Sequence, residues 1–178
     1  MGTVLAAGRH GFFAVAVALG LSACQLAPYD AETYNASLQN LKSILTFFDT
    51  ATDATGDERS YARLKAGYAT IENDLVLLTA RERTRAYNND SAASARKILD
   101  GWRDLRRVHR CRYTTAQART AGEGADCNRD PAIDYAPGAM SNWVLERQRQ
   151  HFIAMFEHLM AGEVYKEGAP DGSRQEGE

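Results

Sequence analysis

The fold is decided by residues 61–109, which read YARLKAGYATIENDLVLLTARERTRAYNNDSAASARKILDGWRDLRRVH. Apolar side chains recur there every three or four positions in two runs: Tyr61, Leu64, Tyr68, Ile71, Leu75, Leu78 and then Ala95, Ile98, Trp102, Leu105, His109. This spacing places one apolar stripe along each of two helices. The polar residues 88–91 between them are too few to join anything but antiparallel neighbours. The stretch therefore predicts a helical hairpin whose helices end near Tyr87 and Tyr113.

One further helical run is expected on each side of this hairpin. Upstream, Asp30 is a candidate N-cap for a stripe of Tyr34, Leu38, Leu41, Leu45 and Phe48. Downstream, Ser141 or Asn142 opens a stripe of Leu145, Gln148, Phe152, Met155 and Leu159, widened by Phe156 and Met160. No alternating strand pattern occurs. The sequence predicts an all-α fold, an antiparallel four-helix bundle over residues 30–165, with three helices and a loosely docked fourth as the alternative.

The N-terminal residues have the pattern of a removable secretory leader. Arg9 and His10 precede an apolar run, Gly11–Leu21, which is too short to span a membrane and suits a signal peptide. The run closes with Leu21-Ser22-Ala23-Cys24, an arrangement that resembles the lipobox of bacterial lipoproteins. The resemblance implies removal of residues 1–23, a diacylglycerol thioether on Cys24 and further acylation, for example by palmitate. The alternative is a plain secreted protein with a chance cysteine.

The same resemblance implies where the mature protein is located, and removal of residues 1–23 sets its net charge. Gln25 stands where Asp would favour the inner membrane, so the resemblance implies the outer membrane, with the protein facing the periplasm. Residues 24–29 form a tether that reaches no more than about 20 Å. Without residues 1–23 the chain carries a net charge of −3. That charge does not fit a nucleic-acid partner, and the expected partners are the membrane, an envelope protein or an anionic glycolipid.

The remaining cysteines, Cys111 and Cys127, make an even pair in an oxidising compartment. A disulfide between them would close a loop of about 17 residues and stabilise the fold on the order of 3 kcal/mol. Two free thiols are the alternative. The disulfide would staple a long loop, residues 114–138, between the third and fourth helices. The polar, Gly-rich residues 166–178 are expected to be a disordered tail.

An arginine stripe on the third helix is the candidate binding surface. We define it as Arg96, Arg103, Arg106, Arg107 and Arg110, which fall beside the apolar seam. Arginine donates in a planar fork that suits phosphate and carboxylate groups. The stripe could therefore hold an anionic lipid or glycan. Alternatively, it pairs with acidic residues of neighbouring helices, such as Glu72, Asp74, Glu146 and Glu157.

No pattern indicates catalysis, a metal or a cofactor. The motifs G-x-S-x-G, H-E-x-x-H, C-x-x-C-H and the P-loop are absent from the sequence. His151 and His158 are seven positions apart, about 10.5 Å along a helix, which is too far to share one zinc ion. In the loop, Asp126, Asn128, Asp130 and Asp134 imitate a calcium loop, but prolines stand where an EF-hand needs Gly and Glu. Ordinary loop-capping acids are expected, and an irregular calcium site is the alternative.

Short features in residues 24–160 extend the resemblance. These are Tyr29-Asp30 after the tether, Phe47-Phe48 near the end of the first helix, the turn from Arg85 to Asn89, and His109 near the end of the third helix. Together they are similar to features of small, uncharacterised, all-helical envelope lipoproteins. The expected function is a lipid-anchored, non-enzymatic binding or scaffolding module. The alternative is a bundle that grips an anionic lipid or glycan through the arginine stripe, and an enzyme with an unrecognised site comes third.

Overall fold

The computed structural model describes residues 27–113, 127 and 140–168. Within these ranges the chain forms four long helices and one short 3₁₀ helix, in the order α2 (Ala31–Asp53), η2 (Gly56–Arg59), α3 (Tyr61–Thr84), α4 (Asn89–Arg112) and α6 (Asn142–Gly168). The described ranges contain no strand. The all-α prediction is confirmed.

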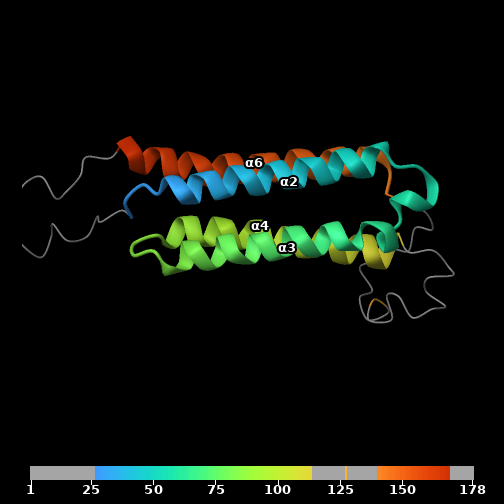
Figure 1. Cartoon of the computed structure of the whole chain (residues 1–178), viewed down its shortest axis with the longest axis horizontal. Helices are drawn as coiled ribbons and strands as arrows, with labels where there is room; N and C mark the ends of the chain where they lie inside the picture. Colours follow the sequence, from blue (N-terminus) through green and yellow to red (C-terminus); the bar gives the residue numbers. More distant parts are fainter. Residues whose placement is uncertain (1–26, 114–126, 128–139, 169–178) are drawn as a thin grey trace, which may run out of the picture.

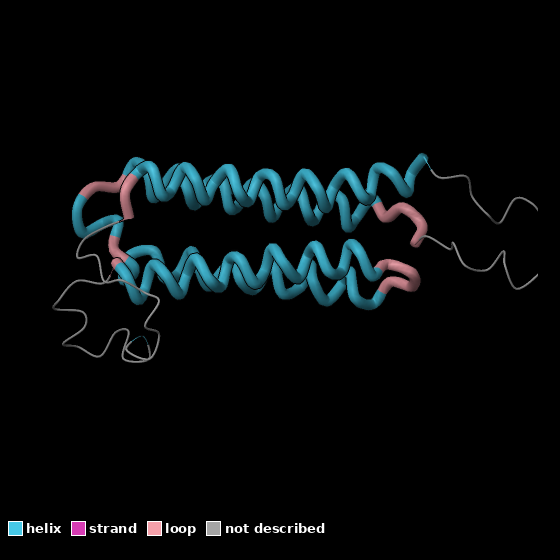
Figure 2. Tube along the Cα trace, turned by 180° about the vertical axis from the view of Figure 1, so that it is seen from behind, coloured by secondary structure: helices cyan, strands magenta, loops and turns pink. Residues whose placement is uncertain are grey.

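The helices form an antiparallel bundle of two layers, with α2 beside α6 and α3 beside α4 (Figures 1 and 2). Contacts also join α2 to α3 and α4 to α6, so the four helices close into a ring around one core. Since α6 packs along both α2 and α4, it is an integral fourth helix and not a loosely docked one. One end of the bundle contains the start of α2, the α3–α4 turn and the end of α6 (Figure 1). We call this end the tip.

Aromatic rings fill the middle of the core. Trp102 is fully buried and makes edge contacts with Phe47, Phe48 and Phe152. Its indole Nε1 donates to the carbonyl oxygen of Tyr68 at 3.0 Å, so its polar atom is satisfied. Gly67 lets α2 and α3 approach closely, because a Cβ added there would lie 3.0 Å from the Phe47 ring.

The predicted apolar stripes of α3 and α4 are confirmed, because every residue named in them is buried. In α6, Leu145, Phe152, Phe156 and Leu159 are buried, whereas Gln148, Met155 and Met160 are only partly so.

The α2 stripe was predicted in the wrong register. Leu38 is 48% exposed, and the buried positions near the start of α2 are Thr33, Ser37 and Asn40. Ser37 Oγ donates to the Thr33 carbonyl at 3.0 Å, and Asn40 Nδ2 donates to the Ala36 carbonyl at 2.9 Å. These hydrogen bonds within the helix satisfy the donors and lower the cost of burying them, although the amide oxygen of Asn40 is buried without a partner among the described residues. A pattern based on hydrophobicity alone passes over them.

The structure also corrects several boundaries. Residues 56–59 form η2, and α3 begins after it at Tyr61. Helix α3 ends at Thr84, before the expected Tyr87. Helix α6 continues through Lys166 to Gly168, into the predicted tail. Cys111 and Cys127 form the predicted disulfide across the α4–α6 connection, with Cα atoms 5.4 Å apart. The leader, Cys24 and the rest of the tail lie outside the described residues.

No helix in the described ranges combines the length and the apolar character that a membrane span needs.

Candidate functional site: a buried polar network at the tip

Two glutamates lie buried at the tip, where the hydrophobic core ends. Glu82 of α3 and Glu163 of α6 are both 0% exposed. Each continues its helix's buried stripe by one turn, Glu82 after Leu78 and Glu163 after Leu159. A buried carboxylate is costly unless it is paired and hydrogen-bonded, so its partners determine whether the tip is stable.

Arg85 and Lys166 supply the opposite charges. The guanidinium of Arg85 donates to Glu163 Oε2 at 3.1 Å and to Glu82 Oε2 at 3.4 Å. Lys166 Nζ donates to Glu163 Oε1 and to Ser91 Oγ, the latter at 2.8 Å. Arg85 and Lys166 expose only 13% and 8% of their side chains, so these ion pairs are largely shielded from water.

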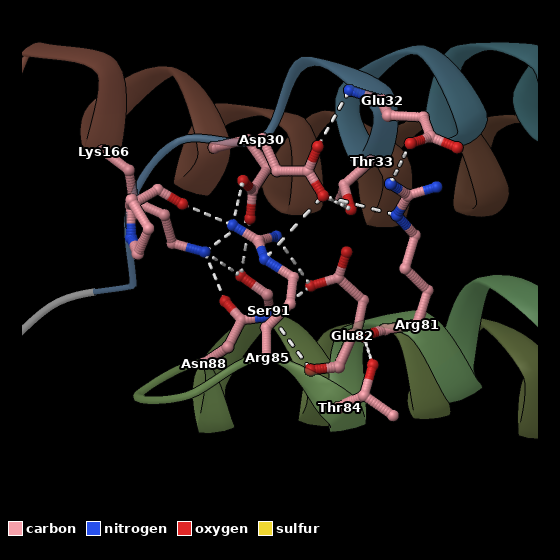
Figure 3. Close-up of polar contacts among 12 residues, drawn as sticks. Asp30, Glu32, Thr33, Arg81, Glu82, Thr84, Arg85, Asn88, Ser91 and Lys166 are labelled. Carbon is pink, nitrogen blue, oxygen red and sulfur yellow. Dashed lines mark hydrogen bonds and ion pairs between the residues drawn. The ribbon is translucent and has the colours of Figure 1, made fainter.

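The α3–α4 turn closes the network. Asn88 Nδ2 donates to the carboxylate and to the main-chain oxygen of Glu82, while Asn88 Oδ1 accepts from Lys166 Nζ. Ser91 Oγ, in the first turn of α4, donates to Glu163 Oε1 at 3.2 Å. Figure 3 shows these side chains converging from the turn and from the ends of the helices.

A second arm of the network holds the segment that enters the domain. Asp30 caps α2 by accepting from Glu32 N at 3.0 Å and from Thr33 Oγ1 at 2.9 Å. The same carboxylate accepts from Arg81 Nε at 3.3 Å, and Arg85 Nη2 donates to the Pro28 carbonyl at 2.6 Å. Residues 28–30 are therefore bonded to Arg81 of α3 and to Arg85, which follows α3 and also binds α6.

The network carries slightly more negative than positive charge. Four carboxylates (Asp30, Glu32, Glu82, Glu163) face three cations (Arg81, Arg85, Lys166), and only Glu32 among the acids is largely exposed. Burial by itself would raise the pKa of Glu163, but hydrogen bonds from Arg85 and Lys166 outweigh it and hold that pKa below its ordinary value. Asp30 behaves alike, since its hydrogen bonds with Thr33 and Glu32 and the charge of Arg81 outweigh burial and lower its pKa. Ionised, paired carboxylates of this kind suit a clamp between helices and not a catalytic acid or base.

The arginine stripe meets acidic residues along its length. Glu72 of α3 accepts from Arg103 Nε at 2.8 Å and from Arg106 Nη1 at 2.7 Å. These hydrogen bonds overcome the effect of burial and lower the pKa of Glu72. Within α4, Arg96 pairs with Asp100 and Arg107 with Asp104. Arg110 also takes part in an interaction. Of the acids suggested by the sequence, Glu72 fills the predicted role, while Glu146 lies against Arg149 of its own helix.

His109 has a structural setting. It is fully buried, with Nε2 3.2 Å from the Arg59 carbonyl and Nδ1 3.1 Å from the Tyr68 hydroxyl. A carbonyl can only accept, so Nε2 carries the proton and Nδ1 accepts from Tyr68. Burial lowers the pKa of His109 to about 4, which keeps the ring neutral at pH 7. Among the described residues, no three His, Cys, Asp or Glu side chains gather as a metal site would require.

The sequence interpretation missed the network. Its signal was present as an acid at each position that continues an apolar stripe, Glu82 after Leu78 and Glu163 after Leu159. A basic residue follows three positions later in both cases, Arg85 and Lys166. Cys24 and the loop acids Asp126, Asp130 and Asp134 lie outside the described residues. No protein-family model, curated protein or solved structure was found to match the chain.

Proposed function

We propose that the chain is a lipid-anchored envelope protein, attached to the membrane through Cys24, whose helical bundle acts as a non-enzymatic binding or scaffolding module. One observation carries the proposal. The buried polar network bonds residues 28–30, the first of the domain, to the ends of α3 and α6. The part of the chain nearest to the anchor is thereby fixed to the end of the bundle that holds the buried polar network.

This coupling has a mechanical consequence. Only three residue steps separate Cys24 from Ala27, where the described structure begins. The distance between these two residues is therefore at most about 10 Å. Beyond Ala27, Arg85 holds the Pro28 carbonyl and Asp30 caps α2. A partner bound to the bundle would therefore be held at a nearly constant height above the membrane. A fixed height suits a scaffold.

The disulfide supports a location outside the cytoplasm. Cys111 and Cys127 are bonded, and such bonds persist in oxidising compartments such as the periplasm. Together with Gln25 after the lipidation site, this favours the outer membrane and its periplasmic face. Acylation at Cys24 would supply the two or more chains that stable anchoring needs.

The arginine stripe supports this scaffold more than it supports a separate ligand site. A phosphate or glycan carboxylate binding at Arg103 and Arg106 would compete with Glu72, which both arginines already bind. Cross-helix pairs of this kind fix the register of α3 against α4. An anionic ligand remains the alternative function.

In-cell crosslinking tests the function. The wild-type protein, Cys24→Ala, and the double variant Arg103→Glu with Arg107→Glu are crosslinked, purified and analysed by mass spectrometry. We expect a specific adduct with an envelope protein that depends on Cys24 and persists in the folded arginine variant. Loss of the adduct in a folded arginine variant would favour the anionic-ligand alternative. No adduct in any form would contradict a scaffolding role.

A further inference from the structure

Large side chains stand exposed around the tip. Tyr87 is 63% exposed, Tyr165 70% and Val164 51%. Tyr87 precedes Asn88 and Tyr165 precedes Lys166, and Lys166 hydrogen-bonds Asn88, so the two tyrosines belong to the same end of the bundle. Figure 1 places the α3–α4 turn and the end of α6 at this end.

The backbone at Tyr87 gives a second, independent indication. Its φ is +57°, in the left-handed region, and no other non-glycine residue in the described ranges has a positive φ. Glycine or asparagine would adopt this conformation at lower cost. The ring is largely exposed, so burial in the core does not offset that cost. Strain of this kind often accompanies a contact made outside the chain.

We infer that the tip sits in the headgroup layer of the membrane, with Tyr87 and Tyr165 as its interfacial contacts. The inference rests on the proposed lipid anchor and names the surface of the domain that meets the lipid. Tyrosine favours this layer because its ring is apolar and its hydroxyl is polar.

Distances along the chain agree with this placement. The three residue steps from Cys24 to Ala27 span at most about 10 Å. The headgroup layer is roughly 5–8 Å thick on each side of the bilayer. One helical turn rises about 5.4 Å, so the last turn of α6 and the α3–α4 turn fit within this layer together.

The charges of the tip permit the contact without anionic lipid. The three cations of the network are each paired with carboxylates of the same network, which include the exposed Glu32. The network has no excess of positive charge, so the contact does not require acidic headgroups. The expected surface is therefore a zwitterionic headgroup layer, and the contact is expected to be insensitive to salt.

Tryptophan quenching tests the inference. The lipid-bearing protein is purified from membranes and reconstituted in phosphatidylcholine vesicles with and without bromine on the acyl chains. Tyr87→Trp and Tyr165→Trp each add an indole at the tip. Leu77→Trp, at a side position that is 69% exposed, is the matched variant for a bundle that lies flat. The native fluorescence comes from Trp143, 67% exposed near the opposite end, and from Trp102 in the core, and the wild-type protein supplies this background for every variant.

The inference predicts that bromine quenches the added fluorescence of the two tip variants clearly more than that of Leu77→Trp, because an indole at the interface lies next to the acyl chains. The Leu77→Trp signal and the native signal are expected to stay nearly unchanged. No added quenching at the tip, or stronger quenching at position 77, would overturn the inference while the anchor stands. Intact mass of the same samples separates the two proposals, because a chain without lipid contradicts the anchor itself. Circular dichroism confirms that each variant is folded.

Discussion

Arg85, just after the end of α3, donates a hydrogen bond to Glu163 of α6 at 3.1 Å, although the two residues are 78 positions apart in the chain. The same guanidinium binds Glu82 and the Pro28 carbonyl. All of these bonds form together only when α3, α6 and the entering segment have the observed register. A network of this kind specifies one arrangement of the helices more than it adds stability, since burying ions is itself costly.

Removing one charged partner of the network should reveal the free-energy cost of burying the others. Glu163→Gln leaves Arg85 and Lys166 buried without the carboxylate that they share, so we expect a loss of about 3 kcal/mol in the free energy of unfolding. Urea unfolding measures it. The matched control is Asp100→Asn, which breaks an exposed pair with Arg96 and should cost less than about 0.5 kcal/mol. Equal losses in the two variants would contradict the role given to the network.

The arginine stripe makes a separate prediction about register. Arg103→Glu places two carboxylates together at Glu72, and we expect a destabilisation of about 1–2 kcal/mol. Adding Glu72→Arg restores an opposite-charge pair with position 103 but places an arginine against Arg106, so the favourable coupling is expected in the full double-mutant cycle and not in the stability of the double variant alone. A coupling energy near zero would show that Arg103 and Glu72 do not stabilise the fold together.

His109 predicts how stability depends on pH. The pKa of His109 in the folded protein is about 4, below the ordinary value of 6.5. Between pH 6.5 and pH 4 the imidazole is therefore protonated in the unfolded chain but neutral in the folded protein. Stability should therefore fall as the pH drops, by about 2 kcal/mol between pH 7 and pH 5. Below about pH 4.5 the lowered carboxylates Asp30, Glu72 and Glu163 add to the loss.

The variant His109→Gln tests this assignment. It keeps one donor and one acceptor at the site but does not titrate, so the slope between pH 7 and pH 5 should become nearly flat. The absolute stability of the variant does not matter, because only the slope reports the proton. An unchanged slope would assign the pH dependence to another group.

Tyr87 predicts an unusual response to glycine. Tyr87→Gly relieves the left-handed strain and, after the entropy cost of glycine, should leave the free energy of unfolding unchanged or raise it by up to about 1 kcal/mol. Ala86→Gly next to it gains no such relief and should lose about 0.5–1 kcal/mol. A loss at position 87 as large as that at 86 would show that the tyrosine serves the fold itself.

The sequence predicted the bundle well where burial and hydrophobicity coincide. The stripes of α3 and α4 are the clearest cases, because their apolar residues are the ones that pack. It failed at the start of α2, where Thr33, Ser37 and Asn40 are buried and Leu38 is exposed. Side-chain hydrogen bonds to the helix backbone reverse the usual preference there, and hydropathy does not report them.

The polar network could not be predicted for a related reason. Glu82 and Glu163 are buried only because Arg85, Asn88, Ser91 and Lys166 reach them, and these contacts join residues up to 78 positions apart. Periodicity shows that an acid continues the stripe but not what neutralises it. The disulfide was easier to predict, because only two cysteines remain once Cys24 is assigned to lipid.

The lipid anchor at Cys24 is the central claim, and the intact mass of the protein purified from membranes tests it most directly. The account predicts a chain that starts at Cys24 and carries diacylglycerol, which partitions into detergent, whereas Cys24→Ala lacks the lipid and leaves the membrane fraction. The variant should unfold as the wild type does, because the bundle and its disulfide are untouched. A mass without lipid, together with an unchanged distribution for Cys24→Ala, would contradict the account.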